Sequence, residues 1–129
     1  MELDINKITE RIINCAIAVH KELGPGLLES AYEICLVHEL VSNKLTVERQ
    51  KGLPIHYRGI NLDCGYRIDL FVEGRVVVEL KAIGKLEPIH EAQLLSYLKL
   101  SRCSVRLLIN FNVKFLKNGI RRLVNQFKE

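Results

Sequence analysis

The chain has 129 residues, of which 48% are apolar and 26% are charged, and its formal net charge is +4. These proportions are typical of a globular protein and exclude a disordered chain, and the length suits one domain better than two, so we expect a single domain over residues 1–129. No apolar run in the sequence approaches the ~20 residues that a membrane-spanning helix needs. The first residues show no export signal, and we therefore expect a cytoplasmic protein.

Charge is distributed unevenly along the chain. Residues 1–65 hold 7 Lys and Arg against 9 Asp and Glu, whereas residues 66–129 hold 12 against 6, so the two halves carry net charges of −2 and +6. A basic half favours a polyanionic partner, although a solvated surface explains such a bias at least as often. Charge alone therefore does not establish nucleic-acid binding.

The spacing of the four cysteines argues against a zinc site. Cys15, Cys35, Cys64 and Cys103 are 20, 29 and 39 residues apart, and no CxxC pair or Cys/His cluster occurs. A chain of this size can build its own core without a disulfide framework. We expect four reduced thiols, most of them buried as small hydrophobic groups.

Two helices are predicted at the start of the chain. Apolar residues recur with helical spacing over residues 5–22, and Gly24-Pro25-Gly26 ends this helix. A second helix is predicted over residues 27–41. It is apolar around most of its circumference, so we expect it to be deeply buried.

The pattern then changes to that of strands. Short strands are predicted over residues 46–50 and 53–58, with Gly59 closing the second. Apolar and polar positions alternate over residues 66–72, which indicates a half-buried strand. A tight turn at Glu73-Gly74 leads into a valine-rich strand over residues 75–81.

A third helix is predicted over residues 89–100, because proline at position 88 suits a first helical turn. Residues 104–111 form another apolar strand, and residues 120–127 follow as a strand or a helix. This order of elements predicts an α/β fold in which one mixed sheet is flanked by helices.

The strongest chemical signal is Asp69, followed ten residues later by Glu79 and then Lys81. Alternate residues of a strand share a face, so Glu79 and Lys81 point the same way while Leu80 points into the core. A two-residue hairpin loop would place Asp69 on the opposite face. A three-residue loop at 72–74 places it diagonal to Glu79, and a loop at 73–75 places it directly opposite.

In either three-residue register, two carboxylates and a lysine converge. Neighbouring carboxylates repel, and their burial is costly unless a cation lies between them. A hard divalent cation such as Mg²⁺ accepts oxygen ligands and keeps water molecules for substrate phosphates, which suits such a site. A surface hairpin with a salt bridge from Lys81 to Glu79 or from Arg67 to Asp69 explains the same residues.

Two further motifs accompany this pair of strands. Residues 26–32 have the pattern GxxExxY, with Gly26, Glu29 and Tyr32 at its fixed positions. Residues 93–97 have the pattern QxxxY, with Gln93 and Tyr97 at its ends.

In this order the motifs resemble those of the PD-(D/E)XK nuclease superfamily and its RecB-like branch. Asp69 and Glu79-x-Lys81 supply the pattern that gives the superfamily its name, with Ile68 in place of the proline. Over roughly residues 10–125, the chain is similar to the small stand-alone GxxExxY proteins of that superfamily. The resemblance implies a restriction-endonuclease-like mixed sheet flanked by helices.

The resemblance also implies a divalent-metal site. Asp69 and Glu79 would bind Mg²⁺ or Mn²⁺ together with the backbone carbonyl of Leu80, and Glu29 would contact the metal directly or through water. Lys81 would orient the attacking water or stabilise charge on the scissile phosphate. The expected catalytic residues are therefore Glu29, Asp69, Glu79 and Lys81. A first-turn acid favoured by the helix dipole remains the alternative for Glu29.

Gln93 and Tyr97 share one face of the third helix, and His90 precedes them by one turn. The resemblance implies that Gln93 and Tyr97 contact the nucleic-acid backbone, which they can do without reading sequence. A tyrosine ring packed on the sheet is the alternative for Tyr97. Gly26 and Tyr32 are expected to shape the second helix, and His20 either caps the end of the first helix or lies near the site.

We therefore expect a Mg²⁺-dependent nuclease that hydrolyses phosphodiester bonds in nucleic acid, with DNA favoured as the substrate. One alternative is a nucleic-acid-binding or accessory module with a nuclease fold and no useful catalysis. A second is a protein-interaction domain unrelated to nucleic acid. No membrane partner is expected. A homodimer, or an unidentified protein partner that supplies specificity, is compatible with so small a chain, although the sequence shows no interface.

Overall fold

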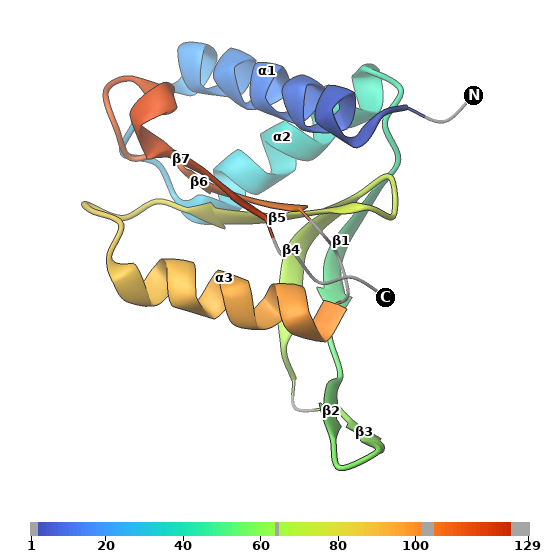
Figure 1. The fold of residues 1–129 in the computed structure, drawn as a ribbon. Coiled ribbons are helices and arrows are strands. Elements are labelled where there is room, and N and C mark those ends of the chain that lie inside the picture. Colours follow the sequence, from blue (N-terminus) through green and yellow to red (C-terminus); the bar gives the residue numbers. More distant parts are fainter. Residues whose placement is uncertain (1–2, 64, 102–104, 125–129) are drawn as a thin grey trace.

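Helices cover both faces of a five-stranded mixed sheet (Figure 1). The computed structural model describes residues 3–63, 65–101 and 105–124, with the side chains of residues 94 and 97–101 outside the description. Helices α1 (Ile5–Leu23) and α2 (Glu29–Ser42) lie on one face, and α3 (Pro88–Ser101) lies on the other. This arrangement confirms the predicted α/β class.

The sheet has the strand order β1-β4-β5-β6-β7. Its strands are β1 (Val47–Gly52), β4 (Arg67–Val72), β5 (Val76–Lys81), β6 (Val105–Asn110) and β7 (Ile120–Val124). Only the β5–β6 pair is parallel, and the other three pairs are antiparallel. Because a parallel pair needs a crossover connection, α3 links β5 to β6 across one face of the sheet.

The segment between β1 and β4 differs from the prediction. Strands β2 (Ile55–Tyr57) and β3 (Ile60–Leu62) form a separate hairpin that extends away from the main sheet (Figure 1). The predicted strand over 53–58 is shorter, and β3 was not predicted. Arg58 and Gly59 have positive φ values of 50° and 80°, as in a two-residue hairpin turn. Gly59 therefore connects β2 to β3.

The end of the chain resolves an open alternative. Within the described residues, the segment predicted as a strand or a helix over 120–127 is the strand β7, which pairs antiparallel with β6. A short 3₁₀ helix, η1 (Leu116–Gly119), precedes it. Residues 125–127 of that predicted segment lie outside the described residues.

The main core lies between the sheet and the pair α1–α2. It contains Ile12 and Ala16 of α1, Leu36 of α2, and Leu70 and Val78 of the sheet, all 0% exposed. Among the described residues, no helix is both long enough and apolar enough to cross a bilayer.

The prediction of a deeply buried α2 is wrong. Its buried residues are Tyr32, Glu33, Leu36 and Leu40, all on one side of the helix. The side chains of Ile34 and Val41 on the other side are 58% and 56% exposed. The helix packs on α1, β1 and β5, which cover only one of its sides. Its apolar residues on the other side therefore stay exposed.

The two cysteines in the described residues agree with the expectation of free thiols. Cys15 is free and buried, and Cys35 is free and half-buried. Burial raises the pKa of the Cys15 thiol, which makes it less reactive. Cys64 and Cys103 lie outside the described residues.

The β4–β5 hairpin adopts the second of the two predicted three-residue registers. Val72 pairs with Val76, so Glu73–Arg75 is the loop, and Glu73 and Gly74 have φ values of 55° and 62°. The Glu73 carboxylate accepts hydrogen bonds of 2.6 Å from both the backbone N–H and the hydroxyl of Thr46, which holds this turn. Continued along the strands, the register places Asp69 opposite Glu79.

Candidate active site

The backbone pairing between β4 and β5 stops just before Asp69. The pairing of β4 with β5 ends at Leu70 and Val78, although both strands continue past that point. Beyond it, the Asp69 carboxylate accepts the backbone N–H of Leu80 at 2.8 Å, so a side-chain oxygen takes a donor that a strand carbonyl would otherwise take. The hydrogen bond fixes the Asp69 carboxylate against β5, next to Glu79.

Glu79 is the most perturbed acid of the site. Its side chain is buried, with the residue only 6% exposed, and this burial together with the neighbouring Asp69 carboxylate raises the pKa of Glu79 to about 8. The positive charge of the fully buried Arg106 opposes the increase. Within the described residues, the Oε1 atom of Glu79 is buried without a hydrogen-bond partner. Buried polar atoms usually have a partner, so such an oxygen is explained by strain, by a catalytic role or by a bound water or ion.

Glu29 and Lys81 complete the expected set. Glu29 is the first residue of α2, and partial burial raises its pKa, with further increases from the Asp69 and Glu33 carboxylates and a decrease from the Lys81 ammonium. These influences require the groups to lie near one another. Charge interactions therefore link Glu79 to Asp69, Asp69 to Glu29 and Glu29 to Lys81, and we call these four residues the carboxylate cluster.

The loop before α2 explains the two outer residues of the GxxExxY motif. Gly24 and Gly26 have φ values of 70° and 96°, which favour glycine. The buried Tyr32 hydroxyl donates to the carbonyl of Gly24 at 2.6 Å and accepts the N–H of Leu27 at 3.1 Å. Its ring stacks on Phe111 with centroids 4.5 Å apart. Tyr32 thus fixes the loop that sets the start of α2, where Glu29 lies.

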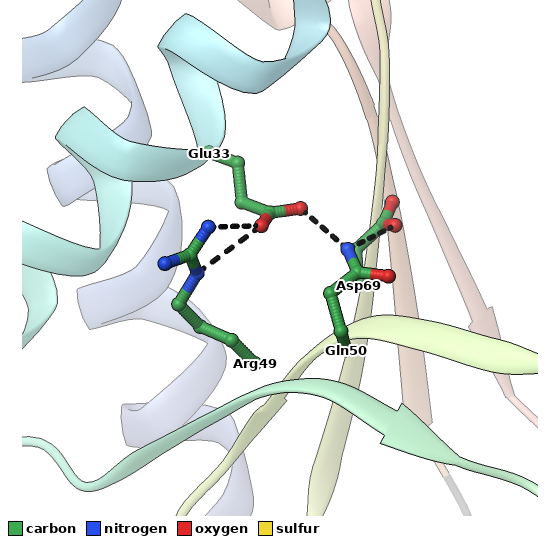
Figure 2. Close-up of polar contacts among 4 residues, drawn as sticks. All are labelled: Glu33, Arg49, Gln50 and Asp69. Atoms are coloured by element: carbon green, nitrogen blue, oxygen red, sulfur yellow. Dashed lines mark hydrogen bonds and ion pairs between the residues drawn. The ribbon is translucent and has the colours of Figure 1, made fainter.

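A second polar network, which the motifs do not predict, joins α2 to the sheet (Figure 2). Gln50 of β1 donates from Nε2 to Glu33 at 2.8 Å and to Asp69 at 3.3 Å. Arg49 donates from Nε and Nη2 to the other oxygen of Glu33, at 3.2 Å and 2.8 Å. Glu33 is 7% exposed, so this two-bond contact satisfies a buried carboxylate.

Gln50 also has a strained backbone, since its φ is 49° in a residue that is not glycine. Such conformations concentrate at functional sites. In the sequence, the only signal for this network is the position of Glu33 one helical turn after Glu29. Neither Arg49 nor Gln50 belongs to a recognisable motif, because their roles depend on which strand lies beside β4.

Gln93 and Tyr97 of the QxxxY motif lie on α3. Gln93 is exposed on α3, and the Tyr97 side chain lies outside the described residues. The His90 Nδ1 atom accepts the N–H of Glu87 at 2.8 Å, so His90 caps the start of this helix. His20 does not cap α1, because its Nε2 donates to the carbonyl of Val113 at 2.8 Å, far along the sequence.

Two buried residues of β6, Arg106 and Asn110, lie next to β5 and act on its end. Arg106 is 0% exposed, and its positive charge lowers the pKa of Glu79. The Asn110 side chain accepts the N–H of Ile83 at 3.1 Å and donates to its carbonyl at 2.9 Å. It therefore fixes the chain just after Lys81.

The residues present suit a divalent cation held by few protein ligands. Within residues 3–63, 65–101 and 105–124, no three His, Cys, Asp or Glu side chains are grouped to hold a metal ion. Asp69, Glu79 and a backbone carbonyl are the groups that would hold such an ion, and a site with so few protein ligands is one in which Mg²⁺ keeps several waters. The unpartnered Glu79 oxygen next to a second carboxylate fits such an ion.

A family model described as the PD-(D/E)XK nuclease superfamily matches residues 6–123. The match covers most of the chain, and the protein belongs to the PD-(D/E)XK nuclease superfamily. Its mixed sheet with flanking helices is consistent with the restriction-endonuclease-like fold. Members are typically nucleases that use divalent metal ions. No curated protein and no solved structure gives a significant match.

Proposed function

We propose that this protein is a Mg²⁺- or Mn²⁺-dependent nuclease that hydrolyses phosphodiester bonds in nucleic acid, with DNA as the favoured substrate. The observation that carries the proposal is the buried Glu79 carboxyl, which has an oxygen without a partner and lies beside Asp69. Within the superfamily, we assign the chain to the GxxExxY proteins and the RecB-like branch on its motifs. We also propose one domain and a cytoplasmic location.

The residues of the cluster have distinct roles in this proposal. Asp69 and Glu79 would hold the ion with the Leu80 carbonyl, and Glu29 would contact it directly or through water. The bound ion would supply Lewis acidity and a water of lowered pKa. Lys81, at the end of β5, has an ammonium whose charge lowers the pKa of Glu29, and it would orient the nucleophilic water or stabilise charge on the phosphate.

Metal binding provides a test that does not depend on activity. Because burial and Asp69 raise the pKa of Glu79 to about 8, its carboxyl binds a proton at neutral pH, and a cation that takes its place should release that proton. We expect Mn²⁺ titration calorimetry in buffers of different ionisation enthalpy to show proton release. Asp69→Asn should abolish the binding. An unchanged melting temperature with Mn²⁺ and no heat of binding would disprove the metal site.

Cleavage itself requires a substrate panel. Linear and circular single-stranded DNA, duplex DNA and RNA should be incubated with Mg²⁺, beside an Asp69→Ala protein as control. We expect cleavage of at least one substrate by the parent protein, none by the variant, and none in EDTA. Circular DNA distinguishes internal cleavage from attack at an end. Metal-dependent nucleic-acid binding without cleavage would instead support the accessory module.

The third helix is assigned to substrate on the QxxxY resemblance. Gln93→Ala and Tyr97→Phe are expected to weaken nucleic-acid binding or turnover while leaving Mn²⁺ affinity unchanged. An equal loss of metal binding in these variants would show that the helix acts on the ion.

A further inference from the structure

A separate site, lined by basic residues, lies outside the carboxylate cluster. A cavity of about 510 Å³ lies between the end of α1, the glycine loop and the segment that leads into η1. Figure 1 shows the end of α1 and η1 side by side at one end of the molecule. The residues that line this cavity include three exposed lysines, Lys21, Lys114 and Lys117, and the exposed Phe115. We call these four residues the basic ledge.

The ledge has one sign of charge. No Asp or Glu lines the cavity, and among the described residues no carboxylate forms an ion pair with the three lysines. Lysines from two segments line one cavity, and their positive charges would all attract an anion bound there. A solvated helix face does not place lysines from two distant segments around one cavity.

The ledge also offers an aromatic surface. Phe115 is 57% exposed, and the Lys114 ammonium lies 5.5 Å from the centre of its ring. Exposed aromatic rings beside phosphate-binding lysines are typical of proteins that bind single strands, because an unpaired base can stack on the ring while the lysines contact the backbone. The paired bases of a duplex cannot stack in this way.

The ledge is firmly connected to the site. The His20 Nε2 donates to the Val113 carbonyl at 2.8 Å and so ties α1 to the segment that carries Lys114 and Phe115. Gly24 and Pro25 form part of the rim, and the Tyr32 hydroxyl holds the Gly24 carbonyl at 2.6 Å. Five residues beyond Gly24, Glu29 joins the carboxylate cluster. The same loop therefore borders both the ledge and the site.

We propose that the basic ledge binds a single-stranded segment of nucleic acid, with Lys21, Lys114 and Lys117 on its phosphates and Phe115 stacked on a base. This inference rests on the proposed function, since it identifies the strand near the site as unpaired. It is tested by binding in EDTA, where cleavage does not contribute.

The experiment measures the anisotropy of a short labelled oligothymidylate over a range of salt concentrations. Lys114→Ala/Lys117→Ala should weaken binding at least tenfold at low salt and reduce the slope of log affinity against log salt by about 1.4, at ~0.7 for each phosphate contact. Lys7→Ala/Lys44→Ala, which removes two exposed lysines elsewhere, is the matched control and should bind as the parent does.

Phe115→Ala tests the stacking separately. It should weaken binding by about fivefold to a hundredfold with the salt slope unchanged. The parent should bind an abasic oligonucleotide of the same length as weakly as Phe115→Ala binds oligothymidylate. Circular dichroism and melting temperature establish that each variant is folded. Because Phe115 is exposed, its variant keeps the test valid if the lysine variant is unstable.

Several results would disprove the proposal that the ledge binds a single strand. These are parental affinity in Phe115→Ala or in the folded lysine variant, equal binding of blunt duplex, or equal competition by polyglutamate, which would indicate an acidic protein partner. Failure of the proposed function looks different. If the protein binds oligonucleotide through the ledge but never cleaves, the ledge proposal stands and the nuclease proposal fails. If it cleaves and the ledge variants behave as the parent does, the nuclease proposal stands and the ledge proposal fails.

Discussion

Replacing Glu79 with glutamine should change how stability depends on pH. The folded protein raises the pKa of Glu79 from 4.5 to about 8, mainly through burial and then through the Asp69 carboxylate. Between these values the native state keeps a proton that the unfolded chain releases, so the free energy of unfolding falls as pH rises. The stabilisation is complete below pH 4.5 and is lost as pH rises to about 8.

The size of the effect follows from the same values. At up to about 1.4 kcal/mol for each pH unit, this one group should lower the free energy of unfolding by roughly 3 kcal/mol between pH 5 and pH 7. Glutamine has nearly the same shape and does not titrate. The difference in stability between parent and Glu79→Gln should therefore shift by this amount across the range, with the variant gaining as pH rises.

Two other shifted acids do not reproduce this profile. The pKa of Glu29 is raised, by partial burial and by Asp69, which gives the same sign, but Glu29 is present in both proteins and cancels in the difference. The pKa of Glu73 is lowered by its hydrogen bonds to Thr46, so its stabilisation is present above its ordinary value of 4.5 and is lost only in more acidic solution.

Urea unfolding at several pH values between 5 and 8 measures the effect, with the exposed Glu87→Gln as the control. Millimolar Mg²⁺ should make the parent's profile shallower, since cation binding favours the ionised carboxyl. Parallel profiles for parent and Glu79→Gln would refute the reasoning, because they would mean that Glu79 is ionised in the folded protein without a cation.

Three further variants test separate parts of the structure. Lys81→Ala should reduce the cleavage rate by a factor on the order of 10² or more with little change in nucleic-acid affinity, and Lys81→Arg should not restore it; parental turnover in Lys81→Ala would leave Lys81 only a salt-bridge role. Tyr32→Phe should cost roughly 1–3 kcal/mol in urea unfolding, because it removes the hydroxyl between Gly24 and Leu27, whereas the exposed Tyr57→Phe should cost little; equal costs would contradict that role. Gly119→Ala should lower the melting temperature strongly, since a Cβ there would meet the Asn110 carbonyl, and Gly84→Ala, in open space, is its control; similar melting temperatures for the two variants would show that the segment moves aside.

Much of the fold follows from local patterns. Helical spacing in α1, proline at the start of α3 and alternation in β4 are properties of short segments, and each predicted its element to within a few residues. The sequence did not predict the β2–β3 hairpin, because Arg58 in its turn has a positive φ, a conformation that residues other than glycine rarely adopt. Composition also predicted burial around α2, whereas burial depends on what packs against each side.

The candidate site divides in the same way. Its candidate residues could be identified from local sequence, since Asp69, Glu79 and Lys81 lie on two strands joined by a short turn, and Glu29 and Tyr32 are one helical turn apart. The hairpin register could be read only from the folded protein, because the contact from Thr46 to Glu73 that helps to hold it comes from outside the hairpin. The tertiary structure alone placed Gln50 between Glu33 and Asp69, and Arg106 beside Glu79. These partners come from strands that are neighbours in space and distant in sequence, so no local pattern contains them.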